Sequence, residues 1–262
     1  MKISIALITL NEEANLPHTL NSIAPLVCNG EGEIIVVDSG STDRTIEIAK
    51  SFDAKIFVEP WKGFAGQKNS AMEKASGDWV LQLDADEAVE PELANEIVRA
   101  IQDGAVEGFW IPRKNYFLGR WIKYGGFYPD PKLRLIRRGA GTFEEHGAHP
   151  TIKMNGPTGS LKHALIHNAY PTLRGYIDHM NSYSSSGAEV AVGQGRRGFN
   201  PVNIVIRPLL TFVYNYIFRL GFLDGREGFL LHCYHAVYVS WKYSKAWELA
   251  GNSSSTKALN EH

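Results

Sequence analysis

Residues 79–90 read Trp-Val-Leu-Gln-Leu-Asp-Ala-Asp-Glu-Ala-Val-Glu, and this stretch decides the fold. Its apolar beginning, Trp79-Val80-Leu81, is typical of a buried central strand. The strand ends in two aspartates one residue apart, Asp84 and Asp86. Open α/β sheets bind ligands at the carboxyl ends of their strands, so both carboxylates are expected at a binding site. The alternative is that one of them only caps the next helix.

Strands and helices alternate along the chain before this stretch. Apolar, β-branched runs predict strands at residues 3–8, 33–37 and 55–58. Helices are expected at residues 14–25, where Pro25 would stop the helix, and at 42–52. Residues 63–69 contain two glycines and are expected to form a loop that leads into another helix. This alternation predicts an α/β fold with right-handed βαβ units and a mainly parallel sheet.

Composition excludes several classes of protein. The chain has 262 residues, 44% of them apolar, and a net charge of −1, so no global positive field favours nucleic acid. Its two cysteines, Cys28 and Cys233, lack metal-ligand spacing and indicate a reducing compartment. Glu12 and Glu13 end the first apolar stretch too early for a signal peptide. Neither a dinucleotide-binding glycine motif nor a P-loop is present.

Polar groups follow three of the expected strands. They are Asn11 and Glu12, then Asp38, then Asp84 and Asp86. In a parallel sheet these strand ends share one edge, where carboxylates can accept hydrogen bonds from ribose hydroxyls or a base N–H. Paired carboxylates also repel one another, so a cation is expected between them. Hard oxygen ligands favour Mg²⁺ or Mn²⁺, which share their coordination shell with substrate phosphates.

Three motifs carry a resemblance to a known family. They are Thr9-Leu10-Asn11-Glu12-Glu13, the segment from Val37 to Asp43, and Leu83-Asp84-Ala85-Asp86-Glu87. In order and spacing they resemble the inverting family 2 glycosyltransferases, which have a Rossmann-like GT-A fold. Further segments resemble the lipopolysaccharide-core β-1,4-glucosyltransferase subfamily: residues 119–121, 128–130, 133–138 and 221–225. The likeness spans nearly the whole chain.

The resemblance implies a role for each residue of the three motifs. Thr9 and Asn11 would belong to the donor site, while Glu12 and Asp38 would hold the uracil and ribose of a UDP-sugar. Asp84 would contact ribose or metal, and Asp86 would coordinate the divalent ion that bridges the diphosphate.

The same resemblance assigns three cations to the donor. Lys68 would lie near the sugar or the phosphates, and Arg113 and Arg134 would neutralise the leaving diphosphate. The alternative for Lys68 and Arg113 is a solvated surface charge.

The general base of the transfer reaction is the least defined position. The incoming hydroxyl has a high pKa, so a carboxylate or histidine within hydrogen-bond reach is needed to accept its proton. Relatives tend to have a His-Glu pair in this region, but here His149 is followed by Pro150 and the matching carboxylate is missing. Glu145 is the first candidate, ahead of Glu144, His149 and Asp130.

The C-terminal part has a different character. A GT-A domain is expected at residues 1–166 and a helical extension at 167–262, with one helix at 172–193. Two apolar and aromatic stretches, 208–218 and 228–241, are too short to cross a bilayer core of about 30 Å. Mixed with arginine and lysine, they favour helices that lie in the headgroup region of an anionic membrane surface. The alternative is a helical cap packed onto the sheet.

The sequence therefore predicts a metal-dependent, inverting glycosyltransferase with no nucleic-acid partner. By resemblance, the donor would be UDP-glucose and the acceptor a heptose of the lipopolysaccharide inner core or another glycan. The expected location is the cytoplasm, with peripheral attachment to the cytoplasmic face of the inner membrane. Two alternatives stay open: a nucleotide-sugar-binding module without turnover, and a GT-A transferase that uses a lipid-phosphate acceptor.

Overall fold

The run at residues 79–84 forms β4 (Trp79–Asp84), the central strand that the sequence predicted. In the computed structural model of the chain, residues 79–83 are buried and Asp84 is partly exposed. β4 pairs in parallel with β1 (Ile3–Thr9) and antiparallel with β9 (Lys132–Arg137). The structure describes residues 1–30, 32–102, 104–145, 150–196 and 198–259, with the backbone alone for residues 29 and 252–259.

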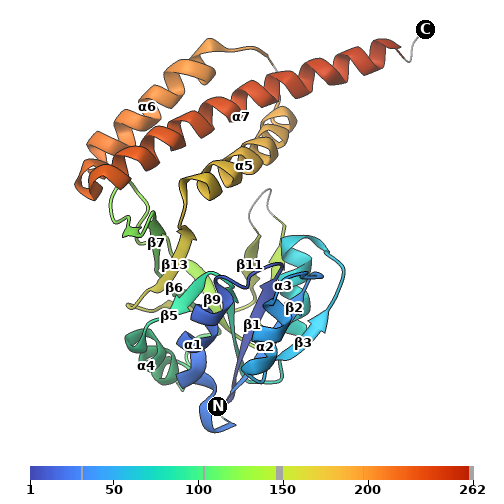
Figure 1. Cartoon of the computed structure of the whole chain (residues 1–262), viewed down its shortest axis with the longest axis vertical. Helices are drawn as coiled ribbons and strands as arrows, with labels where there is room; N and C mark the ends of the chain where they lie inside the picture. The colour runs from blue at the N-terminus through green and yellow to red at the C-terminus, as the bar shows by residue number, and fades with distance from the viewer. Residues whose placement is uncertain (31, 103, 146–149, 197, 260–262) are drawn as a thin grey trace. The chain divides into compact units, whose positions relative to one another are not determined.

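The large sheet has the strand order β12-β6-β9-β4-β1-β2-β3. Figure 1 labels β6, β9, β1, β2 and β3 of this sheet. Its other strands are β2 (Gly32–Asp38), β3 (Lys55–Val58), β6 (Gly108–Ile111) and β12 (Thr158–Ser160). Strands β3, β2, β1 and β4 are parallel, and β9 runs antiparallel between β4 and β6. The predicted α/β fold with a mainly parallel sheet is therefore confirmed.

Alternate side chains of the central strands enter two separate cores. On one face, Leu81 and Leu83 pack with apolar side chains of α1 (Leu16–Val27), α2 (Thr45–Ser51) and α4 (Pro91–Ala100). On the other face, Val80 packs with α3 (Gly63–Glu73) and with Phe143 of β10 (Gly141–Glu144). Because successive side chains point to opposite faces and both faces are covered, the strand sequences are almost wholly apolar.

Several short elements complete the fold around this sheet. They are η1 (Cys28–Gly30), β5 (Glu87–Val89), β7 (Arg113–Phe117), β8 (Arg120–Trp121), β11 (Thr151–Met154) and β13 (Leu165–Tyr170). β10 and β11 form an antiparallel pair, and a smaller sheet has the order β5-β13-β7-β8.

Two local predictions in this region were wrong. Pro25 lies inside α1 instead of ending it, because Pro25 and Asn21 are both exposed. The Asn21 carbonyl, which the proline leaves without a helical donor, can therefore meet water. Residues 63–69 are not a loop but the first turns of α3, where buried Gln67 and Lys68 hydrogen-bond to side chains of the sheet edge.

The chain divides into two compact units. The first comprises residues 1–114 and 129–169, and the second comprises residues 115–128 and 170–262. The sequence placed the boundary after residue 166 and assigned residues 115–128 to the catalytic part. These residues group with the helices because buried Asp224 accepts the backbone N–H groups of Lys123 and Tyr124, at 3.1 and 2.8 Å.

The second unit is built from helices around one long helix, α7 (Gly225–Leu259). The others are α5 (Leu173–Gly193), α6 (Arg207–Val213), the π-helical segments η2 (Val202–Ile206) and η3 (Tyr214–Phe218), and η4 (Gly221–Asp224). Both α5 and α6 pack against α7. Within the described ranges, no helix combines the length and apolar character needed to cross a membrane.

His232 of α7 lies in the core of this second unit with 1% of its surface exposed. Neither ring nitrogen has a hydrogen-bond partner among the described residues. Gly125 and Gly221 leave room for the ring, since a Cβ added at either would lie 2.1 or 2.3 Å from it. Burial, helped by the charge of His235, lowers the pKa of His232 to about 4.

This buried histidine predicts a loss of stability in acid. In the unfolded chain His232 would titrate near its ordinary pKa of about 6.5. Between that pH and about 4, His232 is therefore protonated in the unfolded state but neutral in the folded state. The free energy of unfolding should fall progressively as the pH drops from about 6.5 to about 4, by up to about 3 kcal/mol. Urea unfolding at a series of pH values measures this slope.

The matched variants are His232→Phe and His163→Phe, since His163 is an exposed histidine of the first unit. The acid-dependent loss should shrink in the first variant and persist in the second. An unchanged slope in His232→Phe would show that His232 is not responsible.

Candidate functional site

Three of the predicted residues lie side by side at the carboxyl edge of the parallel strands. Thr9 at the end of β1 is paired in register with Asp38 at the end of β2. On the other side of β1, Ile8 is paired with Asp84 at the end of β4. The chain therefore brings these strand ends together as the motif spacing predicts.

Asp38 is fully buried and organises the loop that follows β2. One carboxylate oxygen accepts the backbone N–H groups of Gly40 and Ser41, at 2.9 and 2.7 Å. The other oxygen accepts the hydroxyls of Thr9 and Ser41, at 2.8 and 2.5 Å. Both oxygens of Asp38 thus have partners within the protein, and they fix the shape of this edge.

Asn11 joins the loop after β1 to the loop after β2. Its backbone N–H donates to the Ser41 hydroxyl at 2.9 Å, and its side-chain oxygen accepts the Thr42 N–H at 2.9 Å. Asn11 has a φ of 55°, in the left-handed region that asparagine tolerates better than most residues. The two loops are therefore held to each other before any ligand binds.

Glu12 lies next to Asn11 in an acidic environment. Burial raises the pKa of the Glu12 carboxyl, although a hydrogen bond from Asn15 opposes the rise. The negative charges of Asp86, Asp43 and Asp84 raise it further. Glu12 thus lies within electrostatic reach of both aspartates of the Asp-x-Asp motif, and a cation bound there would favour the ionised form of Glu12.

A row of ion pairs with alternating sign runs behind the motif, and we call it the ion-pair network. It consists of Lys68, Asp84, Arg134, Glu87, Arg113, Asp130 and Lys132, in that order. Lys68 Nζ lies 2.6 Å from Asp84, Arg134 binds both Asp84 and Glu87, and Arg113 lies 3.1 Å from Glu87 and 2.8 Å from Asp130. Four cations face three carboxylates, so the network carries one net positive charge.

The network is buried at its centre, which changes how its groups titrate. Burial alone would raise the pKa of Asp84, but the Arg134 guanidinium and the Lys68 ammonium outweigh it and hold that pKa well below its usual range. Burial lowers the pKa of Lys68, and the charge of Asp84 opposes this. Lys68 and Arg113, with side chains 8% and 15% exposed, are therefore not the solvated surface charges of the alternative interpretation.

Asp86 has different surroundings from Asp84, although only one residue separates them. Its carboxylate lies 3.3 Å from Nε2 of His167 on β13, and the side chains of Asp86 and His167 are 27% and 15% exposed. A backbone hydrogen bond also joins β13 to the turn between β4 and β5, because the Asn168 N–H donates to the Asp86 carbonyl at 3.0 Å. Asp86 and His167 thus form a partly exposed oxygen and nitrogen pair at the sheet edge.

This pair fits a divalent metal better than Asp84 does. Both oxygens of Asp84 are engaged by cations of the ion-pair network, whereas Asp86 offers a carboxylate next to the imidazole of His167. Among the described residues no group of three or more potential ligands forms a metal cage. Mg²⁺ and Mn²⁺ commonly use one or two protein ligands and complete their shell with substrate phosphates, so a two-ligand site suits them.

The four candidates for the general base lie in different places. Asp130 belongs to the ion-pair network and has a φ of 40°. Glu145 is exposed, and its Oε1 lies next to Gly63 at the start of α3. A Cβ atom added to Gly63 would be 2.6 Å from this oxygen. Glu144 forms a 3.1 Å ion pair with Lys153 on the β10–β11 hairpin. His149 lies outside the described residues.

Two residues of the site, Glu87 and His167, were not predicted from the sequence. Glu87 is fully buried, accepts the Asp84 backbone N–H at 3.0 Å and pairs with two arginines. Its signal was an acid between Asp86 and the apolar Ala88-Val89. His167 follows Leu165-Ile166 at the predicted domain boundary, and its only signal is a histidine within an apolar strand run.

Comparison with known proteins connects this geometry to a family. The family model described as Glycosyl transferase family 2 matches residues 4–156, more than half of the chain. The lipopolysaccharide core biosynthesis glycosyltransferase LpsC of Rhizobium meliloti is 31% identical over 259 residues, which cover 95% of this chain and 93% of LpsC. An uncharacterized glycosyltransferase of Rickettsia typhi is 30% identical over 277 residues, covering 100% of this chain and 92% of that protein.

Solved structures show the fold. The structure of S. aureus TarS 1–349 in complex with UDP has a TM-score of 0.51 at 18% identity and covers 97% of this chain and 92% of that chain. Mannosyltransferase PcManGT from Pyrobaculum calidifontis has a TM-score of 0.53 at 19% identity, covering 96% and 86%. The resemblance noted in the motifs is thus confirmed over the whole chain: the protein belongs to glycosyl transferase family 2 and has the GT-A fold.

Proposed function

We propose that this protein transfers a hexose from a UDP-sugar to an inner-core acceptor of lipopolysaccharide, with inversion at the anomeric carbon. The proposal rests on the different surroundings of the two aspartates of the Asp-x-Asp motif. Asp84 is bound to cations, whereas Asp86 faces His167 at the sheet edge. The likeness to LpsC supports the acceptor, and TarS crystallised with UDP supports the donor. The assignment of glucose as the sugar rests on the subfamily resemblance.

The donor would lie along the edge formed by Thr9, Asp38 and Asp84. Because Asp38 and Asn11 already fix the two loops, the uridine would meet a preformed edge with Glu12 beside it. The ion-pair network carries a net positive charge beneath this edge, where the leaving UDP gains negative charge. Positive groups held in place before the reaction stabilise such charge without reorganising.

A divalent cation held by Asp86 and His167 would neutralise the donor diphosphate and make UDP a better leaving group. PcManGT, a neighbour in fold, was crystallised with GDP-Man and Mn²⁺, which supports a metal in this position. We propose that Asp84 acts differently: its place in the network orients the strand end and keeps Lys68 and Arg134 in position.

Replacing the two proposed ligands should uncouple metal from nucleotide. Asp86→Asn and His167→Ala should each remove most of the Mn²⁺-dependent gain in UDP affinity and leave the metal-free affinity nearly unchanged, because the nucleoside edge is intact. Calorimetric titration of UDP with and without Mn²⁺ measures the difference.

The matched control is His163→Ala, which removes a histidine paired with a carboxylate, Glu96, at 2.9 Å on the same unit. It should behave like the wild-type protein. Full Mn²⁺ dependence in Asp86→Asn would refute the metal assignment, and unchanged turnover in the presence of EDTA would refute metal dependence altogether.

For the general base we propose Asp130. Its carboxylate is joined through Arg113 to Glu87, which accepts the backbone N–H of Asp84, so Asp130 is tied to the motif by consecutive contacts. Like Asp84, Asp130 has a cation on each oxygen, but Lys132 is 41% exposed and Asp130 itself is 24% exposed, so this end of the network is open to solvent while the cations on Asp84 are buried. Its left-handed φ is an uncommon backbone conformation, as is frequent at functional sites. Glu145 instead contacts the start of α3.

Asp130→Asn should lower kcat by about 10²–10⁴-fold, the usual contribution of a general base, with little change in UDP-sugar affinity. Glu145→Gln and Glu144→Gln should retain most of the activity. Steady-state kinetics with an inner-core acceptor and calorimetric donor binding measure both quantities. A large loss in Glu145→Gln with an active Asp130→Asn would transfer the role to Glu145.

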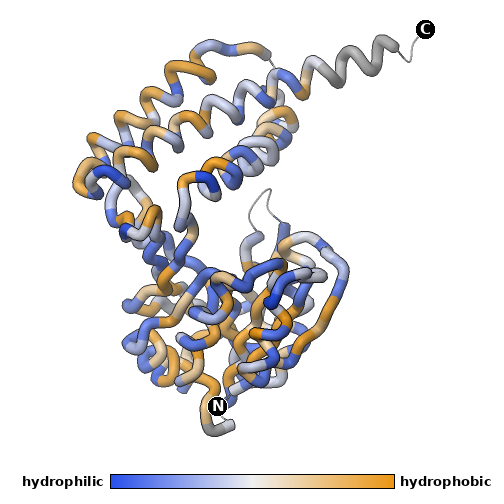
Figure 2. Tube along the Cα trace, viewed as in Figure 1, coloured by the Kyte–Doolittle hydropathy of each residue, from blue (hydrophilic) through white to orange (hydrophobic). Residues whose placement is uncertain are grey.

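We also propose that the second unit attaches the enzyme to the cytoplasmic face of the membrane that carries its acceptor. Large apolar side chains recur every three or four residues along η2, α6 and η3 and are between 47% and 62% exposed, with Phe218 at 74%. These residues, which we call the apolar face, are Val202, Val205, Ile206, Leu209, Leu210, Tyr214, Ile217 and Phe218. Figure 2 shows α6 as a largely hydrophobic segment. A continuous apolar face of this kind differs from the single, scattered apolar residues of an ordinary protein surface. It suits the headgroup region of a bilayer.

Polar substitutions on the apolar face should release the protein from vesicles. Leu209→Gln with Phe218→Gln should weaken binding to anionic vesicles at high salt by about tenfold or more, since burying each such side chain contributes about 1.5–3 kcal/mol. Val58→Gln with Val98→Gln changes two exposed valines of the first unit and should have no effect. Co-sedimentation with vesicles measures binding, and equal behaviour of both variants would exclude the apolar face.

A further inference from the structure

A polar cavity lies in the second unit, beside the apolar face. Its volume is about 270 Å³, and the residues that line it include Arg196, Phe199, Asn203, Ile204 and Tyr243. These residues come from the segment that connects α5 to α6 and from the middle of α7. None of them belongs to the donor site of the first unit, so the cavity needs an explanation of its own.

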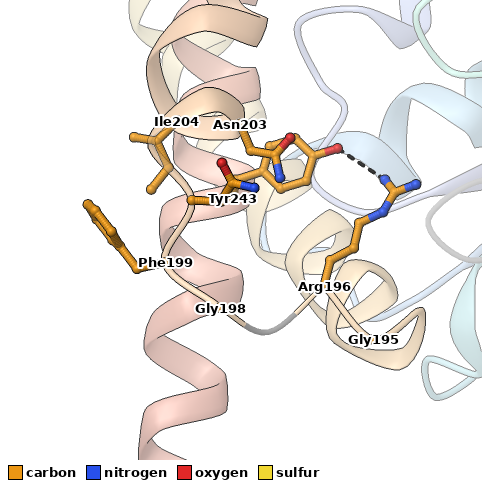
Figure 3. Close-up of a pocket in the computed structure, with 8 residues that line it drawn as sticks. Gly195, Arg196, Gly198, Phe199, Asn203, Ile204 and Tyr243 are labelled. Atoms are coloured by element: carbon orange, nitrogen blue, oxygen red, sulfur yellow. Dashed lines mark hydrogen bonds between the residues drawn. The ribbon is translucent and has the colours of Figure 1, made fainter.

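Two arginines converge on one neutral oxygen at this cavity. The Tyr243 hydroxyl accepts a hydrogen bond from Arg196 at 3.1 Å and another from Arg207. Figure 3 shows Arg196 pointing toward this hydroxyl. The Arg207 guanidinium also lies 5.2 Å from the centre of the Tyr243 ring, and the Lys242 ammonium lies 5.7 Å from it. Three positive charges thus surround one buried tyrosine.

These three cations form no ion pair within the described part of the chain. Arg196 and Arg207 instead donate to the neutral Tyr243 hydroxyl. In the ion-pair network of the first unit, by contrast, Arg113 and Arg134 each pair with two carboxylates. A guanidinium carries five N–H donors in a planar fork, and each of these arginines uses only part of that fork on the tyrosine. Grouped arginines with spare donors match the geometry of phosphate oxygens.

The walls of the cavity indicate where the phosphate comes from. Asn203 and Arg196 line the cavity with polar donors, and Arg207, four residues after Asn203, reaches its edge through the Tyr243 hydroxyl. Phe199 and Ile204 line the other side, and in Figure 3 their side chains point away from the Tyr243 hydroxyl. Phe199 is 61% exposed, and the cavity adjoins Val202, where the apolar face begins. A polar pocket with an apolar border of this kind suits an amphiphile better than a free ion.

We propose that this cavity binds the phosphate group of a membrane lipid, with Arg196 and Arg207 on the phosphate oxygens and the acyl chains along the apolar face. The site would hold the second unit on membranes rich in phosphate-bearing lipid. It rests on the proposed membrane attachment and adds to it a defined headgroup specificity, distinct from general attraction between basic residues and anionic lipid.

The test compares two kinds of anionic vesicle at equal surface potential. One contains phosphatidylcholine with phosphatidic acid, and the other contains phosphatidylcholine with oleate, whose charge is a carboxylate. The full-length wild-type protein should bind the phosphatidic acid vesicles on the order of tenfold more tightly, because a phosphate monoester presents three acceptor oxygens to the two guanidinium groups, whereas a carboxylate presents only two. Equal binding to the two vesicles would overturn the proposal.

Variants assign the preference to the cavity. Arg196→Gln with Arg207→Gln should abolish it, and Asn203→Asp should do the same by placing a carboxylate beside the arginines. The matched control, Arg174→Gln with Arg226→Gln, removes two other exposed arginines of the second unit and should keep the preference. Circular dichroism establishes that each variant is folded. Equal loss in both double variants would reduce the effect to general electrostatics and refute the site.

Two further measurements separate this inference from its neighbours. Calorimetric titration with inorganic phosphate in the absence of vesicles should show weak binding, and tight binding there would make a free phosphate the ligand instead of a lipid. The vesicle assay contains no nucleotide sugar, and transfer to a soluble acceptor is measured separately. If the protein is an active enzyme but shows no headgroup preference, only this inference is refuted. If it binds the lipid but shows no turnover, only the proposed transferase function is refuted.

Discussion

The ion-pair network is the constraint on which the first unit depends. It joins α3, β4, β5, β7 and β9 through charged side chains, three of which are almost completely buried: Lys68, Glu87 and Arg134. Moving such charges out of water is costly, and only close pairing with several partners offsets that cost. Removing one of these three buried side chains would leave an uncompensated charge and destabilise the fold by about 3–5 kcal/mol. The strands that carry these residues can therefore adopt only the register in which every charge meets its opposite.

The same constraint separates the two aspartates of the motif. Asp84 and Asp86 have identical side chains, yet one lies within the network and the other lies outside it, facing His167. Environment, rather than residue type, decides what a carboxylate can do, because neighbouring cations and burial set its charge state and its availability. In the proposed mechanism this difference lets one aspartate maintain the architecture while the other meets the metal.

Prediction from the sequence succeeded where local pattern and packing agree. The strands around β4 are runs of buried apolar residues ending in polar ones, so their existence, order and shared edge could be inferred from residues such as Asp38 and Asp84. It failed where tertiary contacts overrule local signals. The glycines at 63 and 66 are typical of a loop, but buried contacts of Gln67 and Lys68 favour helix. Glu87 and His167 acquire their importance only through partners far along the chain, which no local pattern reveals.

The second unit is assembled from two separate pieces of chain, and this affects how the protein is made. Residues 115–128 depend on Asp224, which lies 101 residues after Lys123. At the usual rate of translation, roughly 5–20 s pass between the emergence of these partners from the ribosome. During that interval Phe117 and Ile122, buried in the finished molecule, have no core to enter. A fragment that ends near residue 169 would keep this apolar segment permanently without its partners, so the catalytic part is expected to need the C-terminal helices in order to be expressed in soluble form.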